Sequence, residues 1–310
     1  MTVRRAGPLF DTIVMVDWSA ASTPSPRRPS PDAIWLAVAR RGAGVEPPRY
    51  LRTRAEAVAT LADLLAAEAE AGRRALAGFD FPFGYPAGFA KRVAGRAEAL
   101  ALWSRLAATI ADGPDNRNDR FAVAERLNRL FPGVGPFWGR PARADHPDLP
   151  AKGSLREGHG LPERRAVEMR VRRAQPCWKL YTTGSVGSQA LLGIAALERL
   201  RRDPRLATRV SVWPFETGFA APEAPVALAE IYPGLLAAET APQPGEVKDA
   251  AQVRTVAAAL SDLDGAGALA PLFEGPTDLD ASTRAAALRE EAWILGVGAE
   301  DALRAAALRR

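Results

Sequence analysis

The chain has 310 residues, a formal net charge of +5 and 47% hydrophobic residues, enough apolar side chain for one large core or two small ones. This composition excludes an intrinsically disordered chain, and the single cysteine excludes an internal disulfide and a zinc site built on a cysteine pair. Because there are only two histidines, any metal site has to be built mainly from carboxylates.

Targeting signals and charge distribution indicate where the protein works. Residues 1–11 are not followed by the apolar stretch of a secretory signal, and no run approaches the roughly 20 apolar residues of a membrane span. We therefore expect a cytoplasmic protein without a membrane partner. Only four of the 41 cationic residues are lysine, an arginine bias that points to a GC-rich bacterial genome. Residues 140–179 carry ten basic and five acidic side chains, which fits either a phosphate-attracting surface or a solvated loop.

The first 80 residues predict four strands and one helix. Apolar runs at 12–16, 33–39 and 49–51 are typical of three consecutive strands. Thr53 and Glu56 have capping-box spacing and open a helix. A further buried strand at 75–79 stops before Pro82, because proline cannot continue a central ladder. The predicted order is β, β, β, α, β.

The remaining chain is predicted to be helical at first and then to return to strands. The pattern predicts helices over 97–131, with a break at 112–115, and a long functional loop over 132–176. It then predicts the following elements: a helix over 186–202, strands over 209–213 and 226–231, a helix over 249–263 and a helical tail over 282–310. We expect a single α/β domain spanning 1–310, with an inserted helical and loop region at about 97–185.

Three of the apolar strands end in an acid, at Asp17, Asp80 and Glu230. If these strands are parallel neighbours, the acids gather at the sheet edge where sites form in α/β proteins. Asp249 lies at helical spacing from the apolar residues that follow it, which places it on the helix face packed against the sheet. Each residue also has a structural explanation. An aspartate at the end of a strand is common in turns, and an acid in the first turn of a helix is favoured by the helix dipole, which explains Asp249 equally well.

Clustered carboxylates suit hard cations, so the sequence favours Mg²⁺ or Mn²⁺ over zinc. A pair of such ions can activate water and stabilise the leaving oxygen in phosphodiester hydrolysis. A carboxylate dyad for glycoside hydrolysis could use the same residues but would not need a third and a fourth acid.

Polar residues in the inserted region form a second set of candidates, for substrate binding. They are Lys179, Thr182, Thr183, Ser185, Asn116 and Arg117. The first four stand around a glycine-rich segment just before a helix, where free backbone amides can hold a phosphate. A turn in which Ser185 caps that helix explains the same pattern, and a plain helix start explains the last two residues.

Four short motifs together resemble the DUF429 group of RNase H-like nucleases. They are VMVDWS at 14–19, GFDFPFG at 78–84, AEIYP at 229–233 and KDAA at 248–251. Their order and spacing agree with the family over roughly 11–263, together with residues 293–296. The resemblance implies an RNase H-like fold, with a mixed five-stranded sheet flanked by helices, and a two-metal hydrolase acting on nucleic acid or another phosphodiester. The predicted β, β, β, α, β order fits that topology.

The resemblance also implies roles for the four acids. Asp17 would bridge both metals from the first strand, Asp80 and Glu230 would be the acids of the fourth and fifth strands, and Asp249 that of the final core helix. A second aspartate often follows within the next turn of that helix, and this chain has none there. If the acid of the fifth strand is not Glu230, Glu216 is the alternative metal ligand, referred to as the reserve ligand.

Two other function classes stay open. Some similar proteins have been labelled as molybdopterin guanine dinucleotide or cobalamin biosynthesis proteins, so one alternative is a non-catalytic accessory protein of such a pathway. The other is an ATP-using enzyme of the actin and sugar-kinase type. That class normally has a duplicated domain, and the sequence has no internal repeat.

Overall fold

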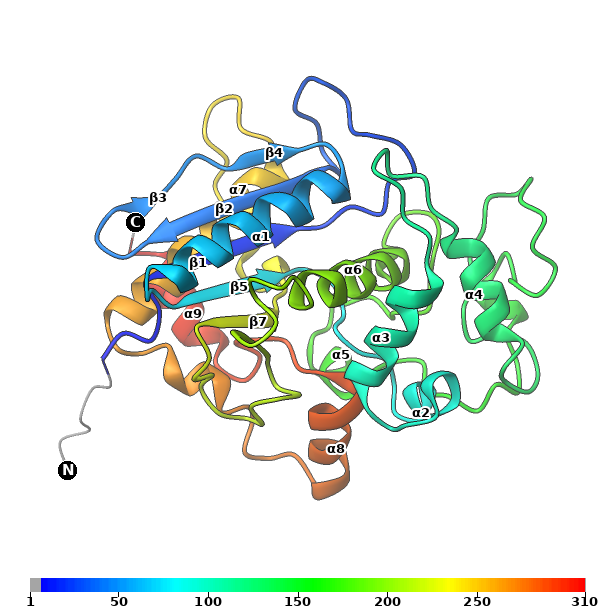
Figure 1. Ribbon diagram of the computed structural model, residues 1–310. Coiled ribbons are helices and arrows are strands. Elements are labelled where there is room, and N and C mark those ends of the chain that lie inside the picture. Colours follow the sequence, from blue (N-terminus) through cyan, green and yellow to red (C-terminus); the bar gives the residue numbers. More distant parts are fainter. Residues whose placement is uncertain (1–6, 310) are drawn as a thin grey trace.

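The computed structural model describes residues 7–309, which form a mixed α/β structure with a seven-stranded sheet flanked by helices (Figure 1). The strands are β1 (Thr12–Asp17), β2 (Ile34–Arg40), β3 (Gly44–Val45), β4 (Arg49–Leu51), β5 (Ala75–Phe79), β6 (Val210–Val212) and β7 (Val226–Glu230). The α-helices are α1 (Arg54–Glu70), α2 (Phe89–Ala94), α3 (Ala99–Thr109), α4 (Arg120–Asn128), α5 (Ala166–Arg170), α6 (Val186–Arg201), α7 (Lys248–Gly265), α8 (Ala281–Ala286) and α9 (Glu300–Ala307). Short helical turns of other types are η1 (Gly153–Leu155), η2 (Pro233–Leu236), η3 (Ala270–Phe273) and η4 (Ala287–Glu291).

The strand order in the sheet is β3-β2-β1-β5-β7-β6, with β4 also paired to β2. β2 is antiparallel to β1, whereas β1, β5, β7 and β6 are mutually parallel. The sheet has seven strands rather than the five implied by the resemblance. β2 is long enough to pair with two short strands, β3 and β4, and β6 adds a strand outside β7. Because β1, β5 and β7 are parallel, their carboxyl ends lie at one edge of the sheet.

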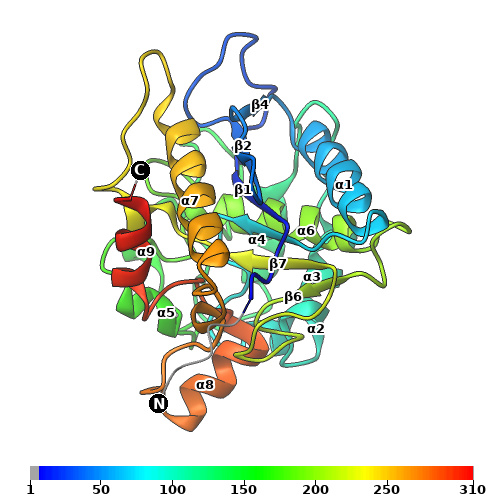
Figure 2. The same cartoon turned by 90° about the vertical axis from the view of Figure 1, so that its left-hand side faces the viewer.

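Helices cover both faces of the sheet, with α7 and α9 on one side and α1 and α6 on the other (Figure 2). Side chains alternate between these layers along each strand. Val14 and Val16 of β1 belong to the core that includes α1 and α6, whereas Ile13 and Met15 belong to the core that includes α7. The face to which a strand residue points therefore decides which helices it meets.

The start of α1 and the inserted region agree with the sequence patterns. Thr53 caps α1, accepting a hydrogen bond from the Glu56 amide at 3.1 Å. The predicted helical stretch from 97 to 131 is divided between α3 and α4. Residues 132–176 are mostly loop, interrupted by η1 and the short α5.

The prediction of a continuous helical tail over 282–310 is wrong in its middle. After α8 and the π-type turn η4, the chain leaves the helix at Ala292, whose φ is +66°. The Leu295 amide then donates a hydrogen bond to the Glu230 carbonyl at 2.9 Å, and Trp293 is fully buried. Pairing with the end of β7 replaces helical hydrogen bonds there, and the helix resumes at α9. Within residues 7–309, no helix combines the length and apolar character needed to cross a bilayer.

Candidate active site

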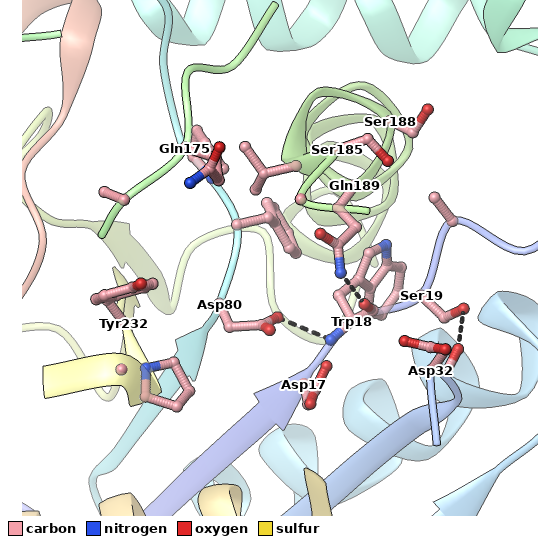
Figure 3. A pocket seen from close by; sticks show the side chains of 18 of the residues that line it. Asp17, Trp18, Ser19, Asp32, Asp80, Gln175, Ser185, Ser188, Gln189 and Tyr232 are labelled. Carbon is pink, nitrogen blue, oxygen red and sulfur yellow. Dashed lines mark hydrogen bonds between the residues drawn. The ribbon is translucent and has the colours of Figure 1, made fainter. Parts of the chain in front are cut away.

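A cavity of about 750 Å³ opens at the sheet edge where β1, β5 and β7 end (Figure 3). Its lining includes all four predicted acids, namely Asp17, Asp80, Glu230 and Asp249. The loop before α6 and the loop between β1 and β2 complete the wall. A cavity of this size is typical of sites for small molecules or for part of a larger substrate.

Asp17, Asp80 and Asp249 come from three elements and lie between the sheet and α7. Asp17 ends β1 in phase with Ile13 and Met15, on the face that packs against α7. Asp80 follows β5 and extends the ladder by one step, since its amide donates to the Val16 carbonyl at 3.3 Å. Asp249 lies in the first turn of α7, as the helical phase predicts. These three acids are called the acid trio below.

Electrostatic interactions couple the acid trio. Burial raises the pKa of Asp17 well above its usual value, and Asp80, Asp249 and then Asp32 raise it further. Burial also raises the pKa of Asp80 to about 7, although the Trp18 amide, which donates to Oδ1 at 2.8 Å, and a hydrogen bond with the Asp17 carboxyl act in the opposite direction (Figure 3). The Asp17 and Asp80 carboxyls are therefore close enough to share a proton.

No basic side chain compensates these charges. In the described part of the chain, neither lysine nor arginine forms an ion pair with a member of the acid trio. The same residues contain no group of three acidic, histidine or cysteine side chains already spaced to hold a metal ion. A cation shared by the trio would thus require side-chain rotation, with the proton between Asp17 and Asp80 displaced.

Glu230 lines the cavity from the opposite face of the sheet. In the parallel register it pairs with Phe79, one residue before Asp80, so its side chain points toward the α6 layer with Leu228. Both of its oxygens are bound by Arg165, Oε2 to Nη1 at 2.8 Å and Oε1 to Nη2 at 2.7 Å. The Phe83 amide also donates to Oε2, at 2.9 Å. In this arrangement Glu230 is an ion-paired residue, and both of its oxygens already accept hydrogen bonds.

Arg165 is itself buried, with an exposed fraction of 1%, and its Nε also binds Glu168 at 2.8 Å. Burial alone would lower the pKa of this guanidinium, but Glu230 and Glu168 outweigh it and hold the pKa well above the usual value. Arg165 belongs to the long inserted loop, so this ion pair attaches the loop to the end of β7.

The reserve ligand and three of the six substrate-binding candidates lie outside the cavity lining. Glu216 accepts hydrogen bonds from Arg201 and from the Val212 amide, both at 2.9 Å. Asn116 is buried and is held by Arg54 and the Thr23 carbonyl, while Arg117 is exposed and pairs with a neighbouring aspartate. The buried environment of Asn116 fits a structural role.

The other candidates stand around the start of α6. Thr182, Thr183 and Ser185 line the cavity, whereas Lys179 does not and donates instead to the Thr183 carbonyl at 2.6 Å. Ser185 occupies the N-cap position of α6 but makes no side-chain capping hydrogen bond, so the capping explanation for this residue is wrong.

Among the cavity residues that were not identified from the sequence, Asp32 and Arg120 add charge to its wall. Asp32 lies before β2, and its amide donates to Asp249 Oδ2 at 2.9 Å. An indication was available, because an antiparallel β1–β2 hairpin brings the residues before β2 next to the end of β1. Arg120, the first residue of α4, is buried at the cavity wall. Nothing in its local pattern distinguishes it from a solvent-exposed arginine.

The chain matches no family model, and comparison with the curated proteins and with the solved structures found no match. The interpretation of the cavity therefore rests on its geometry and chemistry.

Proposed function

We propose that this protein is a metal-dependent hydrolase of phosphodiester bonds, in which Asp17, Asp80 and Asp249 hold Mg²⁺ or Mn²⁺. One observation carries the proposal: three carboxylates from three elements face one cavity without a basic partner. Removing charged carboxylates from water is costly unless a counter-charge binds them. Oxygen ligands with a net negative charge are the donors that these cations prefer.

Buried acids elsewhere in the chain are compensated in one of two ways: some pair with arginines, whereas Asp264, Glu290 and Glu291 accept hydrogen bonds from backbone amides. Glu68 and Glu198, two buried glutamates far from the cavity, each contact two arginines, and Glu230 is bound by Arg165. The acid trio differs from these acids because Asp80 and Asp249 act electrostatically on Asp17, and no arginine pairs with any of the three in the described residues. We infer that a cation from solution takes the place of the missing arginine.

Hydrolysis of a phosphodiester joins a water oxygen to phosphorus and breaks the bond to one ester oxygen, which leaves as an alcohol. A bound divalent cation supplies an activated water and stabilises the leaving oxygen. The chain fixes the direction of Asp80 through its backbone, because Gln189 donates to the Trp18 carbonyl and the Trp18 amide donates to Asp80 (Figure 3). Asp32 adds a fourth negative charge beside Asp17 and orients Asp249 through its amide.

The resemblance to RNase H-like nucleases is consistent with this proposal in two respects. The observed order is β1, β2, β3, β4, α1, β5, which matches the β, β, β, α, β pattern apart from the additional two-residue strand β3, and the acids from β1, β5 and α7 line one cavity at the sheet edge. The proposal departs from the family pattern at Glu230, to which we assign the structural ion pair with Arg165.

The test is a cleavage screen of the purified protein against labelled single-stranded and double-stranded DNA and RNA, with Mg²⁺, Mn²⁺ or EDTA. We expect cleavage that EDTA abolishes and that falls more than about 100-fold in Asp17→Asn and Asp249→Asn, since even the loss of a group that only hydrogen-bonds to a metal ligand costs about 10–100-fold. Glu216→Gln, outside the cavity, is the control and should keep its activity. Cleavage that survives EDTA or is unchanged in Asp17→Asn would contradict the proposal.

A further inference from the structure

Arg120 is a buried cation whose hydrogen-bond partners in the protein are all neutral. Its exposed fraction is 8%, and its Nε donates to Ser188 Oγ at 2.9 Å. Its Nη1 donates to Ser22 Oγ at 2.8 Å and to Asn118 Oδ1 at 2.7 Å. The guanidinium lies over the Phe121 ring, 4.4 Å from the centroid. These contacts fix its position at the cavity wall without neutralising its charge.

No carboxylate within residues 7–309 forms an ion pair with Arg120, and none of these residues accepts a hydrogen bond from its Nη2. The nearby Asp112 is bound by Arg54 through two hydrogen bonds, of 2.7 and 2.6 Å. Arg54 therefore binds both oxygens of Asp112, and Arg120 leaves a positive charge without an ion pair on the cavity wall. Arg120 nevertheless remains charged at neutral pH, since burial and Arg54 lower its pKa only to about 10. A buried cation without a counter-ion is costly, so a ligand anion is the expected partner.

The start of α6 points to the same kind of ligand. This helix has 16 residues, and its N-cap side chain makes no capping hydrogen bond. Ser185, Val186 and Gln189 line the cavity, and Figure 3 shows Ser185 and Gln189 at the end of α6, across the cavity from Asp17. The Gly187 amide donates to the Lys179 carbonyl at 3.0 Å, so an anion at this position would meet the other first-turn amides and the positive end of the helix dipole. Ser188, in the first turn, is the residue that binds Arg120.

We propose that Arg120 and the first turn of α6 form an anion subsite that holds a phosphate group of the substrate. This assignment of the ligand rests on the proposed phosphodiesterase function. The cavity has an acidic part, with the acid trio and Asp32, and this separate basic part. In a phosphodiester substrate, the phosphate that is cleaved meets the acidic part and a second phosphate meets Arg120. The preferred substrate class is therefore a phosphodiester that carries at least two phosphate groups.

Binding of inorganic phosphate in the presence of EDTA tests the subsite without metal or catalysis. By calorimetric titration, we expect Arg120→Gln to bind phosphate about tenfold more weakly or worse, because a charge-assisted hydrogen bond is lost. Arg117→Gln is the matched control: it removes an exposed arginine three residues away and should bind like the wild type. Asp17→Asn should bind phosphate at least as well as the wild type while losing cleavage. Phosphate binding thus tests the subsite, and cleavage tests the proposed function, so that either can fail without the other.

A second variant covers the case in which Arg120→Gln does not fold. Ser185→Asp places a carboxylate at the N-cap, which favours the helix while repelling an anion, so melting should occur at the same or a higher temperature with phosphate binding reduced. In cleavage assays, kcat/KM of Ser185→Asp should fall about tenfold for a dinucleotide with a terminal phosphate. The fall should be smaller for bis(p-nitrophenyl) phosphate, which has one phosphate, so the ratio of the two kcat/KM values reports the subsite. Wild-type phosphate affinity in Arg120→Gln or in Ser185→Asp would overturn the proposal.

Discussion

Asp80 and Glu230 come from the ends of neighbouring parallel strands and line the same cavity, yet their environments are opposite. Glu230 is held by both terminal nitrogens of Arg165 and by a backbone amide. Asp80 has no basic partner among the described residues and shares a hydrogen bond with another carboxyl. Glu230 pairs with Phe79, which is one residue before Asp80. Because side chains alternate along a strand, Glu230 and Asp80 point to opposite faces of the sheet.

The comparison teaches that an acid at a strand end is not by itself a ligand. What distinguishes the two acids is whether the fold provides a counter-charge. Arg165 enters from the inserted loop and neutralises the acid on the α6 face. On the α7 face the next carboxyl comes from α7 itself, so negative charge accumulates. We expect the first arrangement to stabilise the fold and the second to destabilise it until a cation binds.

The largest stability effect is expected on the Glu230 side. Arg165→Met leaves Glu230 and Glu168 buried without a cation, and breaking a buried ion pair in this way costs roughly 3–5 kcal/mol of unfolding free energy. Denaturant unfolding measures the loss. Arg173→Met, at an exposed arginine of the same cavity, is the control and should stay within about 0.5 kcal/mol of the wild type. If Arg165→Met were as stable as the wild type, the ion pair of Glu230 would not stabilise the fold, and the proposed difference between Glu230 and Asp80 would be wrong.

The second effect is a gain in stability, and it depends on pH. In the metal-free protein the pKa of Asp80 is raised from 3.8 to about 7, so the folded state binds a proton that the unfolded state releases. The contribution of Asp80 to the unfolding free energy should therefore fall as pH rises from about 4 to about 7, so Asp80→Asn should gain stability relative to the wild type over this interval and be the more stable of the two at pH 8.

Asp203 supplies the control for this pH dependence. Arg205 lowers the pKa of Asp203 to about 2, so the stability it contributes is present above pH 4 and is lost as pH falls through 2. Asp203→Asn should therefore leave the slope between pH 4 and 7 unchanged. A stability difference between Asp80→Asn and the wild type that stays constant over that interval would show that the acid trio is compensated.

Much of the site could be predicted from sequence, because strand ends and helix phase are local properties. The patterns placed Asp17, Asp80 and Glu230 at one sheet edge and turned Asp249 toward it, as observed. They could not place Glu230 on its face, since register depends on which residues of two strands pair. The partner Arg165 lies 65 residues away in sequence, in a loop without periodicity.

The tail and the second part of the cavity show the same limit. The π-type turn at 287–291 and the bridge to β7 depend on a tertiary hydrogen bond, so helical periodicity alone mispredicted residues 292–299. Arg120 is distinguished because it forms no ion pair with any acid in the part of the chain that the structure describes. Both features depend on contacts between segments that are distant in the sequence, so the local sequence pattern does not predict them.

The most direct test of the central claim is the binding of Mn²⁺ to the purified protein at pH 7.5, followed by electron paramagnetic resonance of the free ion. Our account predicts binding to the wild type and to the Glu216→Gln control. It also predicts a loss of affinity of more than about tenfold in Asp17→Asn, Asp80→Asn and Asp249→Asn. A wild type that binds no Mn²⁺, or three variants that bind it as tightly as the wild type, would contradict the account.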